Sequence, residues 1–275
     1  MSIDRPVRPA SPPACGPHLR VTAGTGPDLG GSRLRDGTAR MDVIGFLAEV
    51  WNQFRLHYPE FLRGYRATII LTIVSMALAL LVGALVALLR TSEFPPARWA
   101  TSVYTEFFRN TPLLVQLIFW FFALPKLPHF TMPLFGEVDW LLSPWQAAII
   151  GLTLYTGAYC AEAIRSGLIS IDKGQTEAAR AIGLTYTQTR LYVVFPQAMR
   201  VALPLLTSIL SALVRNSALV SAVGVKELLG ASDAIQQQNF LTFEVFTVTL
   251  VLYLSLTLPL AYASGHLERW VAPPR

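Results

Sequence analysis

From residue 67 onward, the chain alternates between long apolar runs and short polar connections. Five runs are apolar over most of their length: 67–89, 111–125, 140–161, 201–224 and 245–265. A helix needs about 20 apolar residues to cross a bilayer, and the second run reaches that length only if its helix starts near Trp99. That longer helix includes Glu106 and Arg109 near the interface. The pattern predicts an all-α integral membrane protein with five transmembrane helices.

The first forty residues differ in composition from the rest of the chain. Residues 1–40 contain six Pro, six Gly and six Arg, with few large apolar side chains. Such a segment cannot bury enough surface to offset the entropy lost on ordering. We expect either a disordered extension or a mis-assigned start, because ordinary composition begins at Met41.

A mixed segment follows at residues 41–64. Its large apolar side chains recur at spacings of three and four: Ile44, Leu47, Trp51 and Phe54. This spacing predicts an amphipathic helix that lies at the membrane interface. The transmembrane domain is then expected at residues 65–270, with a short tail at 271–275.

Composition agrees with a membrane protein and narrows the possible functions. Hydrophobic residues make up 53% of the chain and charged residues 14%, whereas a soluble domain carries about a quarter charged residues. The net charge of +5 would suggest nucleic-acid binding in a soluble protein. In a membrane protein it indicates Lys- and Arg-rich cytoplasmic loops, so we predict no nucleic-acid partner.

Lys and Arg are distributed unequally between the connections. Alternate connections contain most of them: Arg90, Arg98, Arg165, Lys173, Arg180, Arg190, Arg200, Arg269 and Arg275. The other connections contain only Lys126 and Lys226, beside several acidic residues. Because cytoplasmic loops are enriched in Lys and Arg, we expect the first set and the C-terminus in the cytoplasm and the N-terminus outside. The basic N-terminal tail contradicts the orientation given by this simple count, and so do Arg55, Arg63 and Arg66.

The longest predicted cytoplasmic connection, residues 165–200, contains a short helix-forming stretch. Residues 177–182 are rich in good helix formers, and Gly183 suits the left-handed position that ends a helix. The stretch is expected to expose a small apolar face: Ala178, Ala179 and Ile182. From the pattern alone, this face could dock into another protein or lie at the membrane interface.

A second helix is predicted to begin directly after this stretch. Thr185 and Gln188 have the spacing of a capping box, and the helix continues toward the fourth apolar run. Pro196 and Pro204 lie inside it and are expected to kink it, because proline lacks the N–H needed for a helical hydrogen bond.

Several ordered motifs resemble one family of transport proteins. They occupy residues 109–116, 158–167 with 173–175, 177–183 with 195–198 and 203–204, and 215–219. The third resembles the EAA loop of bacterial ABC importer permeases, and the others resemble the signatures of the polar amino acid permease branch. The likeness covers roughly residues 60–270. It departs from the usual pattern at Arg215, where Lys is more frequent, and does not account for residues 1–40.

The resemblance implies a permease subunit of the inner (plasma) membrane that performs alternating access. It implies pairing with a second copy or a sister permease, contact with membrane lipid, delivery of an amino acid by a periplasmic solute-binding protein, and two cytoplasmic ATPase subunits that use ATP and Mg²⁺. The implied ATPase-coupling positions are Gly174, Gln175, Glu177, Ala178, Ala179 and Gly183.

The chain itself shows no sequence pattern typical of an enzyme. It has no G-x-x-x-x-G-K-[ST] phosphate loop, so any ATP must be hydrolysed by another subunit. Its four histidines form neither a nucleophile–base constellation nor a metal-ligand pair. We therefore expect no enzymatic activity, no bound cofactor and no metal in this chain.

The fourth apolar run contains a polar patch at Arg215, Asn216 and Ser217. A charge at that depth is costly unless it is paired or hydrated. One interpretation places the patch on the translocation path and favours a cargo such as glutamate or aspartate. The alternatives are a structural ion pair and an arginine that extends to the outer interface.

Four further residues are structural or gating candidates, in addition to Pro196 and Pro204. Glu162 and Arg165 are three apart, so they can pair along one helix face. Arg109 and Pro112 mark the start of the second apolar run, where Pro112 is expected to start or bend the helix.

Three rival functions remain open. One is a membrane anchor that only recruits an ATPase and transports nothing. An ABC permease for another small solute would share the EAA segment. An ion-coupled secondary transporter would usually show more spans and internal repeats, and no convincing repeat is visible here.

Overall fold

The computed structural model describes residues 43–92, 94–126, 131–132, 136–137 and 142–271. The prediction for residues 1–40 and all but the first residue of the predicted tail lie outside this range.

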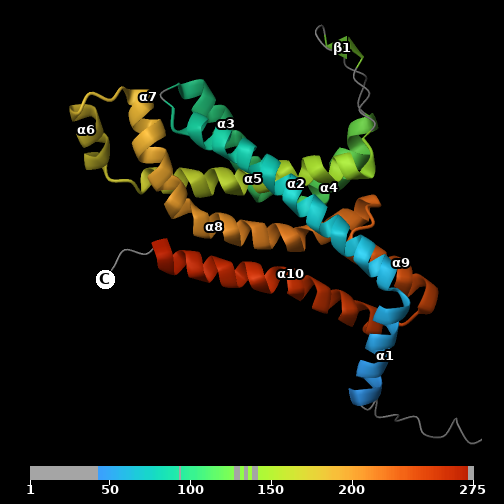
Figure 1. Ribbon diagram of the computed structural model, residues 1–275. Helices are drawn as coiled ribbons and strands as arrows, with labels where there is room; N and C mark the ends of the chain where they lie inside the picture. The colour runs from blue at the N-terminus through green and yellow to red at the C-terminus, as the bar shows by residue number, and fades with distance from the viewer. Residues whose placement is uncertain (1–42, 93, 127–130, 133–135, 138–141, 272–275) are drawn as a thin grey trace, which may run out of the picture. The chain divides into compact units, whose positions relative to one another are not determined.

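Helices dominate the described residues (Figure 1). The α-helices are α1 (Val43–Leu56), α2 (Tyr58–Arg90), α3 (Pro95–Asn110), α4 (Leu113–Ile118), α5 (Pro144–Ile169), α6 (Lys173–Ala181), α7 (Tyr186–Gln188), α8 (Phe195–Asn216), α9 (Leu228–Asn239) and α10 (Thr242–Val271). Two π-helical segments, η1 (Phe119–Ala123) and η3 (Thr189–Val194), and two 3₁₀ segments, η2 (Leu124–Lys126) and η4 (Ser217–Val223), extend them. Strands β1 (Thr131–Met132) and β2 (Gly136–Glu137) pair antiparallel, with Thr131 opposite Glu137.

Within the described residues, four helices are long and apolar enough to cross a membrane: Tyr58–Arg90, Pro144–Ile169, Tyr186–Val223 and Thr242–Leu267. They correspond to four of the five predicted spans, and the all-α membrane fold is confirmed. The second predicted span is instead a shorter apolar helix, Leu113–Ala123.

The expectation of one helix running from Trp99 through the second apolar run is wrong. α3 ends at Asn110, and Thr111 is extended with φ −110° and ψ 139°. The residue before a proline is disfavoured in the helical region, so Pro112 forces the break and α4 starts after it. The buried Gln116 side chain donates to the Phe108 and Thr111 carbonyls, each at 3.2 Å, and thereby satisfies backbone groups freed by the break.

The predicted helix at residues 41–64 is also divided. α1 ends at Leu56, His57 has non-helical φ −107° and ψ 21°, and residues 58–64 begin α2. Pro59 lies in the first turn of α2, where its missing N–H costs nothing.

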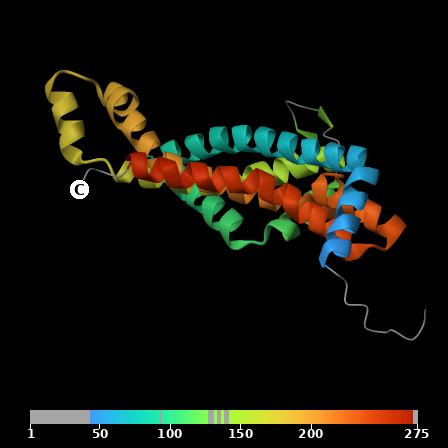
Figure 2. The ribbon, with the colours of Figure 1, turned by 60° about the horizontal axis from the view of Figure 1, so that its bottom comes forward.

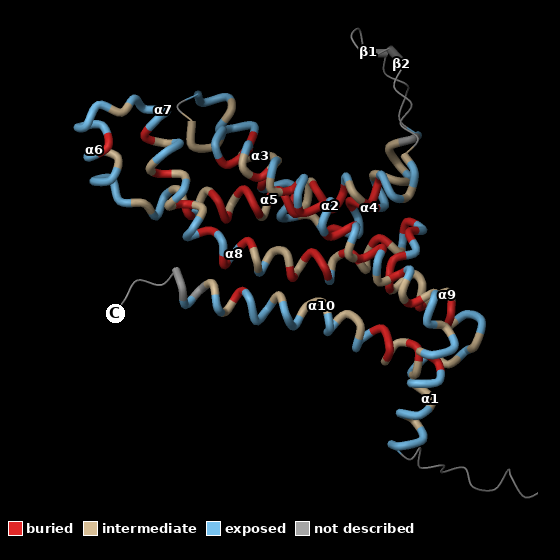
Figure 3. The backbone as a smooth tube through the Cα atoms, in the orientation of Figure 1, coloured by how far each residue is buried: buried red, intermediate tan, exposed pale blue. Residues whose placement is uncertain are grey.

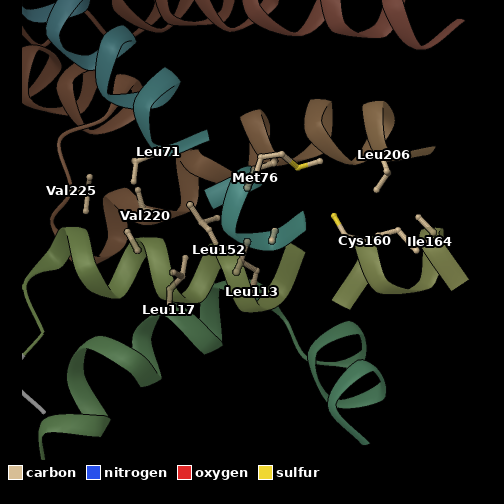
Figure 4. Packing of buried hydrophobic residues seen from close by; sticks show 14 of the residues in the cluster. Leu71, Met76, Leu113, Leu117, Leu152, Cys160, Ile164, Leu206, Val220 and Val225 are labelled. Atoms are coloured by element: carbon tan, nitrogen blue, oxygen red, sulfur yellow. The ribbon is translucent and has the colours of Figure 1, made fainter. Parts of the chain in front are cut away.

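The main core forms where α2, α5 and α8 pack together. Buried residues concentrate on α5 (Figure 3), which is the most buried of the four long helices. Leu71 and Met76 of α2 meet Leu152 of α5, and Leu113 and Leu117 of α4 cover the same cluster (Figure 4). Removing apolar surface from water contributes about 25 cal/mol per Å². Between helices in lipid, close packing of the side chains stabilises the bundle instead.

One glycine permits a close approach of α2 and α5 in this core. A Cβ added at Gly83 would lie 2.6 Å from the Cβ of Cys160 and 3.0 Å from the backbone N of Ala161. Only a residue without a side chain lets α2 contact α5 at this point.

A buried carboxylate joins three helices at the start of α9. Glu227 is fully buried and accepts hydrogen bonds from the backbone N–H groups of Leu229 and Gly230 at 3.0 and 2.9 Å. It also accepts from Thr68 of α2 at 3.2 Å and from Tyr253 of α10 at 2.6 Å. Burial raises the pKa of Glu227, although these four donors act in the opposite direction.

We expect Glu227→Gln to destabilise the protein although Gln has nearly the same shape. Each carboxylate oxygen faces a backbone N–H, so either orientation of the amide places an NH₂ group against a donor. One buried N–H left without an acceptor costs about 1–3 kcal/mol, which a lower melting temperature in detergent would report. Asp233→Asn on the same helix is the control. Equal melting temperatures for the two variants would contradict this role.

Candidate coupling loop and substrate pathway

α6 extends beyond the ends of the long helices, in the connection between α5 and the helix that contains α8 (Figures 1 and 2). It starts at Lys173, four residues before the predicted start, because Asp172 caps it. The Asp172 Oδ1 atom accepts a hydrogen bond from the Gly174 N–H at 2.6 Å.

The end of α6 is as predicted. Gly183 has φ 93°, the Gly183 N–H donates to the Arg180 carbonyl at 3.0 Å, and the Leu184 N–H donates to the Ala179 carbonyl at 3.2 Å. These two bonds form a Schellman motif, whose left-handed position favours glycine.

The surface of α6 differs from the prediction at one position. Most coupling candidates are exposed: Gly174, Gln175, Glu177, Ala178 and Gly183. Ile182 is also exposed, at 82%. Ala179 is only 5% exposed because α6 packs against η3, so Ala179 positions the helix and does not belong to the exposed face.

The segment after α6 begins with the predicted capping box. The Thr185 hydroxyl accepts from the Gln188 N–H, and the Gln188 side chain accepts from the Thr185 N–H at 2.9 Å. The helix then becomes π-helical over η3 and changes direction between α7 and α8 (Figure 1).

The two prolines occupy different positions in this helix. Pro196 lies in the first turn of α8, directly after η3. The change of direction between α7 and α8 (Figure 1) occurs here, and π-helical turns are a frequent cause of kinks in helices. Pro204 lies inside α8, and its carbonyl accepts from Ser264 of α10 at 3.1 Å. Their gating role stays a prediction.

A hydrogen bond connects this segment to the end of α2. The Arg190 Nη2 atom of η3 donates to the Thr91 carbonyl at 2.9 Å, and Thr91 caps α2. The Arg190 guanidinium also lies 4.9 Å from the Tyr186 ring centroid. The sequence identified Arg190 only as one of many loop cations.

The predicted pairing of Glu162 with Arg165 is present and is part of a larger network. The Arg165 Nε atom donates to Glu162 Oε1 at 3.0 Å, and its Nη2 atom makes a second, short contact with the same oxygen. The other oxygen of Glu162 accepts from Arg90 Nη1 at 2.7 Å. The Glu162 carboxylate therefore joins α5 to the end of α2. Arg90 Nη1 also donates to Thr105 of α3 at 3.1 Å.

A cavity of about 260 Å³ lies between α5 and α8. Its polar lining comes from Tyr155, Thr156 and Tyr159 of α5 and from Asn216 of α8. The two tyrosine hydroxyl oxygens are 3.3 Å apart. The Arg109 guanidinium lies 5.6 Å from the Tyr159 ring centroid, which brings this predicted residue close to the same cavity. The tyrosines were missed, although polar aromatic residues four apart in an apolar span were a signal.

The three members of the predicted polar patch have different environments. Asn216 lines the cavity, whereas Ser217 is fully buried and donates to the Val214 carbonyl at 2.8 Å, which is a structural contact. Arg215 is exposed, and its Nη1 atom donates to Ser211 Oγ at 3.0 Å. Among the described residues, no carboxylate forms an ion pair with Arg215.

Comparison with known proteins places this arrangement in a family. Over residues 79–273, the chain matches the family described as binding-protein-dependent transport system inner membrane component. The probable glutamine ABC transporter permease protein GlnM of Bacillus subtilis (strain 168) is 33% identical over 213 residues, 78% of this chain and 94% of that protein. The L-cystine transport system permease protein TcyB of the same organism is 33% identical over 220 residues, 78% of this chain and 89% of that protein.

A solved structure gives the same result for the fold. A chain from the crystal structure of an amino acid ABC transporter with histidines superposes with a TM-score of 0.69 at 32% identity. The match covers 82% of this chain and 97% of that chain.

Proposed function

The chain belongs to the binding-protein-dependent transport system inner membrane component family and is a permease subunit of an amino-acid ABC transporter, and on this basis we propose that it forms the translocation path of an ATP-driven importer for polar amino acids. The observation that supports the proposal most directly is the exposed, capped helix α6 in the connection between two spans (Figure 2). The chain contains no phosphate loop, so separate subunits hydrolyse the ATP, with Mg²⁺.

α6 is the docking element for the ATPase. Its exposed residues form the contact: Gly174, Gln175, Glu177 and Ala178 on the helix, with Ile182 and Gly183 at its end. Movement of α6 passes to η3 through the packing of Ala179 and then to α2 through the bond from Arg190 to Thr91. The ion pair of Arg90 with Glu162 connects the end of α2 to α5. These contacts form one continuous physical connection between the docking helix and the spans.

We assign positions to the remaining partners from the two ends of the helix bundle. α6 and the C-terminal end of α10 lie at one end of the bundle (Figure 1), which we assign to the cytoplasm. α1 and α9 lie at the other end, where the N-terminus and the solute-binding protein are expected. A second permease, identical or a sister subunit, completes the path.

We assign the cavity lined by Tyr155, Tyr159 and Asn216 to the amino-acid path. Hydroxyl and amide groups suit the polar groups of an amino acid, and the relatives named for glutamine and L-cystine support cargo of this class. The exposed cation of Arg215 favours glutamate or aspartate.

Reconstitution tests the function as a whole. The permease, its ATPase and its solute-binding protein, identified from neighbouring genes, are placed in liposomes with labelled amino acids. We expect accumulation that requires ATP and persists when ion gradients are dissipated. Accumulation driven by an ion gradient without ATP would favour a secondary transporter, and preference for a different solute class would reject the amino-acid cargo.

Two substitutions test the path itself. Arg215→Ala is expected to lower uptake of acidic amino acids about tenfold relative to glutamine, since one charge-assisted hydrogen bond contributes about 1.5–3 kcal/mol. Asn216→Ala is expected to lower uptake of every cargo. Arg98→Ala on α3, with no side-chain partner among the described residues, is the control. Unchanged uptake and preference in Arg215→Ala would remove Arg215 from the path.

A further inference from the structure

A second cavity, outside the proposed substrate path, lies at the α6 end of the bundle. This groove of about 350 Å³ lies between the ends of α2 and α5 and the segment that follows α6. Its lining includes Leu88, Thr91, Leu168, Tyr186, Arg190 and Leu191. Most of the lining is apolar, and Arg190 supplies the charge.

Among the described residues, Arg190 has no counter-ion in this groove. Its contacts are the Thr91 carbonyl, at 2.9 Å, and the face of the Tyr186 ring. No carboxylate among the described residues forms an ion pair with it. A cation in apolar surroundings is stabilised by an anion, so the charge of the groove favours an anionic occupant.

The groove continues into an apolar stripe on the membrane-spanning helix α2. Leu81, Leu85 and Leu88 are all exposed and recur at spacings of four and three, which places them on one helix face. Their seven-residue separation spans about 10 Å along the helix axis. The stripe runs from the groove toward the middle of the span, so an occupant that fits both parts has an anionic head and a long apolar tail.

We propose that this groove binds an anionic phospholipid from the leaflet on the α6 side. Its phosphate accepts hydrogen bonds from Arg190, and an acyl chain lies along Leu88, Leu85 and Leu81. A soluble partner segment does not fit as well, because the stripe lies within the membrane-spanning part of α2. The lipid would contact both the end of α2 and the segment after α6, so the anionic lipid content of the membrane would influence the connection between them.

Native mass spectrometry of the purified full chain tests the proposal. The detergent-solubilised chain is titrated with phosphatidylglycerol, with phosphatidylcholine of the same acyl chains, and with glycerol phosphate. We expect at least one phosphatidylglycerol to be retained, with about tenfold weaker retention of phosphatidylcholine and none of glycerol phosphate, because both charge and acyl chain are required. Arg190→Gln should weaken phosphatidylglycerol retention about tenfold. Arg190→Lys, which keeps the charge, should retain most of it, as should the control Arg98→Gln.

Several results would overturn the proposal. Equal retention of the two lipids would remove the role of charge, and binding of glycerol phosphate alone would indicate a free-anion site. An equal loss in Arg190→Lys and Arg190→Gln would show that charge is not the determinant. Cross-linking of position 88 to a second permease copy or to the ATPase in the assembled transporter would identify a protein as the occupant.

Discussion

Replacing Gly183 by Val is expected to reduce amino-acid uptake at least tenfold while the permease still inserts in the membrane. Gly183 has φ 93°, and no atom lies within 4 Å of an added Cβ, so the effect comes from backbone conformation and not from a clash. The left-handed region costs an ordinary residue roughly 1–2 kcal/mol, and a β-branched residue is a clear outlier there. The Schellman motif would open, and α6 would lose its fixed end against η3.

Ala179→Asp tests the same element by a different mechanism. Ala179 is buried between α6 and η3, and a carboxylate there would be buried without a partner, which is costly. ATP-dependent uptake and co-purification of the ATPase are the measurements, and both should fall in each variant.

Gly183→Asn is the matched control for these variants, because Asn tolerates the left-handed region. It should retain most of the uptake and ATPase binding. Normal uptake in both Gly183→Val and Ala179→Asp would refute the coupling role of α6.

Glu162→Gln is expected to have the second large effect, through the ion network between α2 and α5. The side chains of Arg90, Glu162 and Arg165 are 19%, 25% and 29% exposed, so solvent screens them only partly. Removing the carboxylate leaves two cations without their counter-ion, and we expect a destabilisation of about 2–4 kcal/mol. A lower melting temperature should accompany loss of uptake.

The control for the network is an exposed pair of the same chemistry. Glu60 and Arg63 also lie three residues apart, but their side chains are 42% and 75% exposed. Glu60→Gln should change stability by less than about 1 kcal/mol. Equal effects of the two substitutions would show that the Glu162 network has no special role.

Local patterns were sufficient to predict the long spans and the end of α6. Apolar runs of adequate length specify membrane helices because lipid offers no hydrogen-bond partners to the backbone. Gly183 and the pair of Thr185 with Gln188 specify caps through interactions within a few residues, so their geometry followed from sequence. Asp172 was an equally local signal that was missed.

Other errors came from proline. Pro112 divides the expected second span, and Pro59 marks the start of α2 three residues after α1 ends. In both cases the apolar pattern continues across the break. The spacing of apolar residues indicates which face of a helix is buried, but it does not show whether the helix is interrupted.

The sequence by itself determined the membrane class, the long spans and the capped helix in the basic loop, because each depends on neighbours in the chain. Only the tertiary structure decided which polar groups meet. Arg90 contacts Glu162 across 72 positions, Arg190 contacts Thr91 across 99, and Glu227 contacts Thr68 across 159. The tertiary structure also placed Asn216 at the cavity and Ser217 in the core, and it showed that Ala179 faces inward. Such contacts depend on how helices pack against one another, and a helix pattern specifies its buried face without specifying its partner.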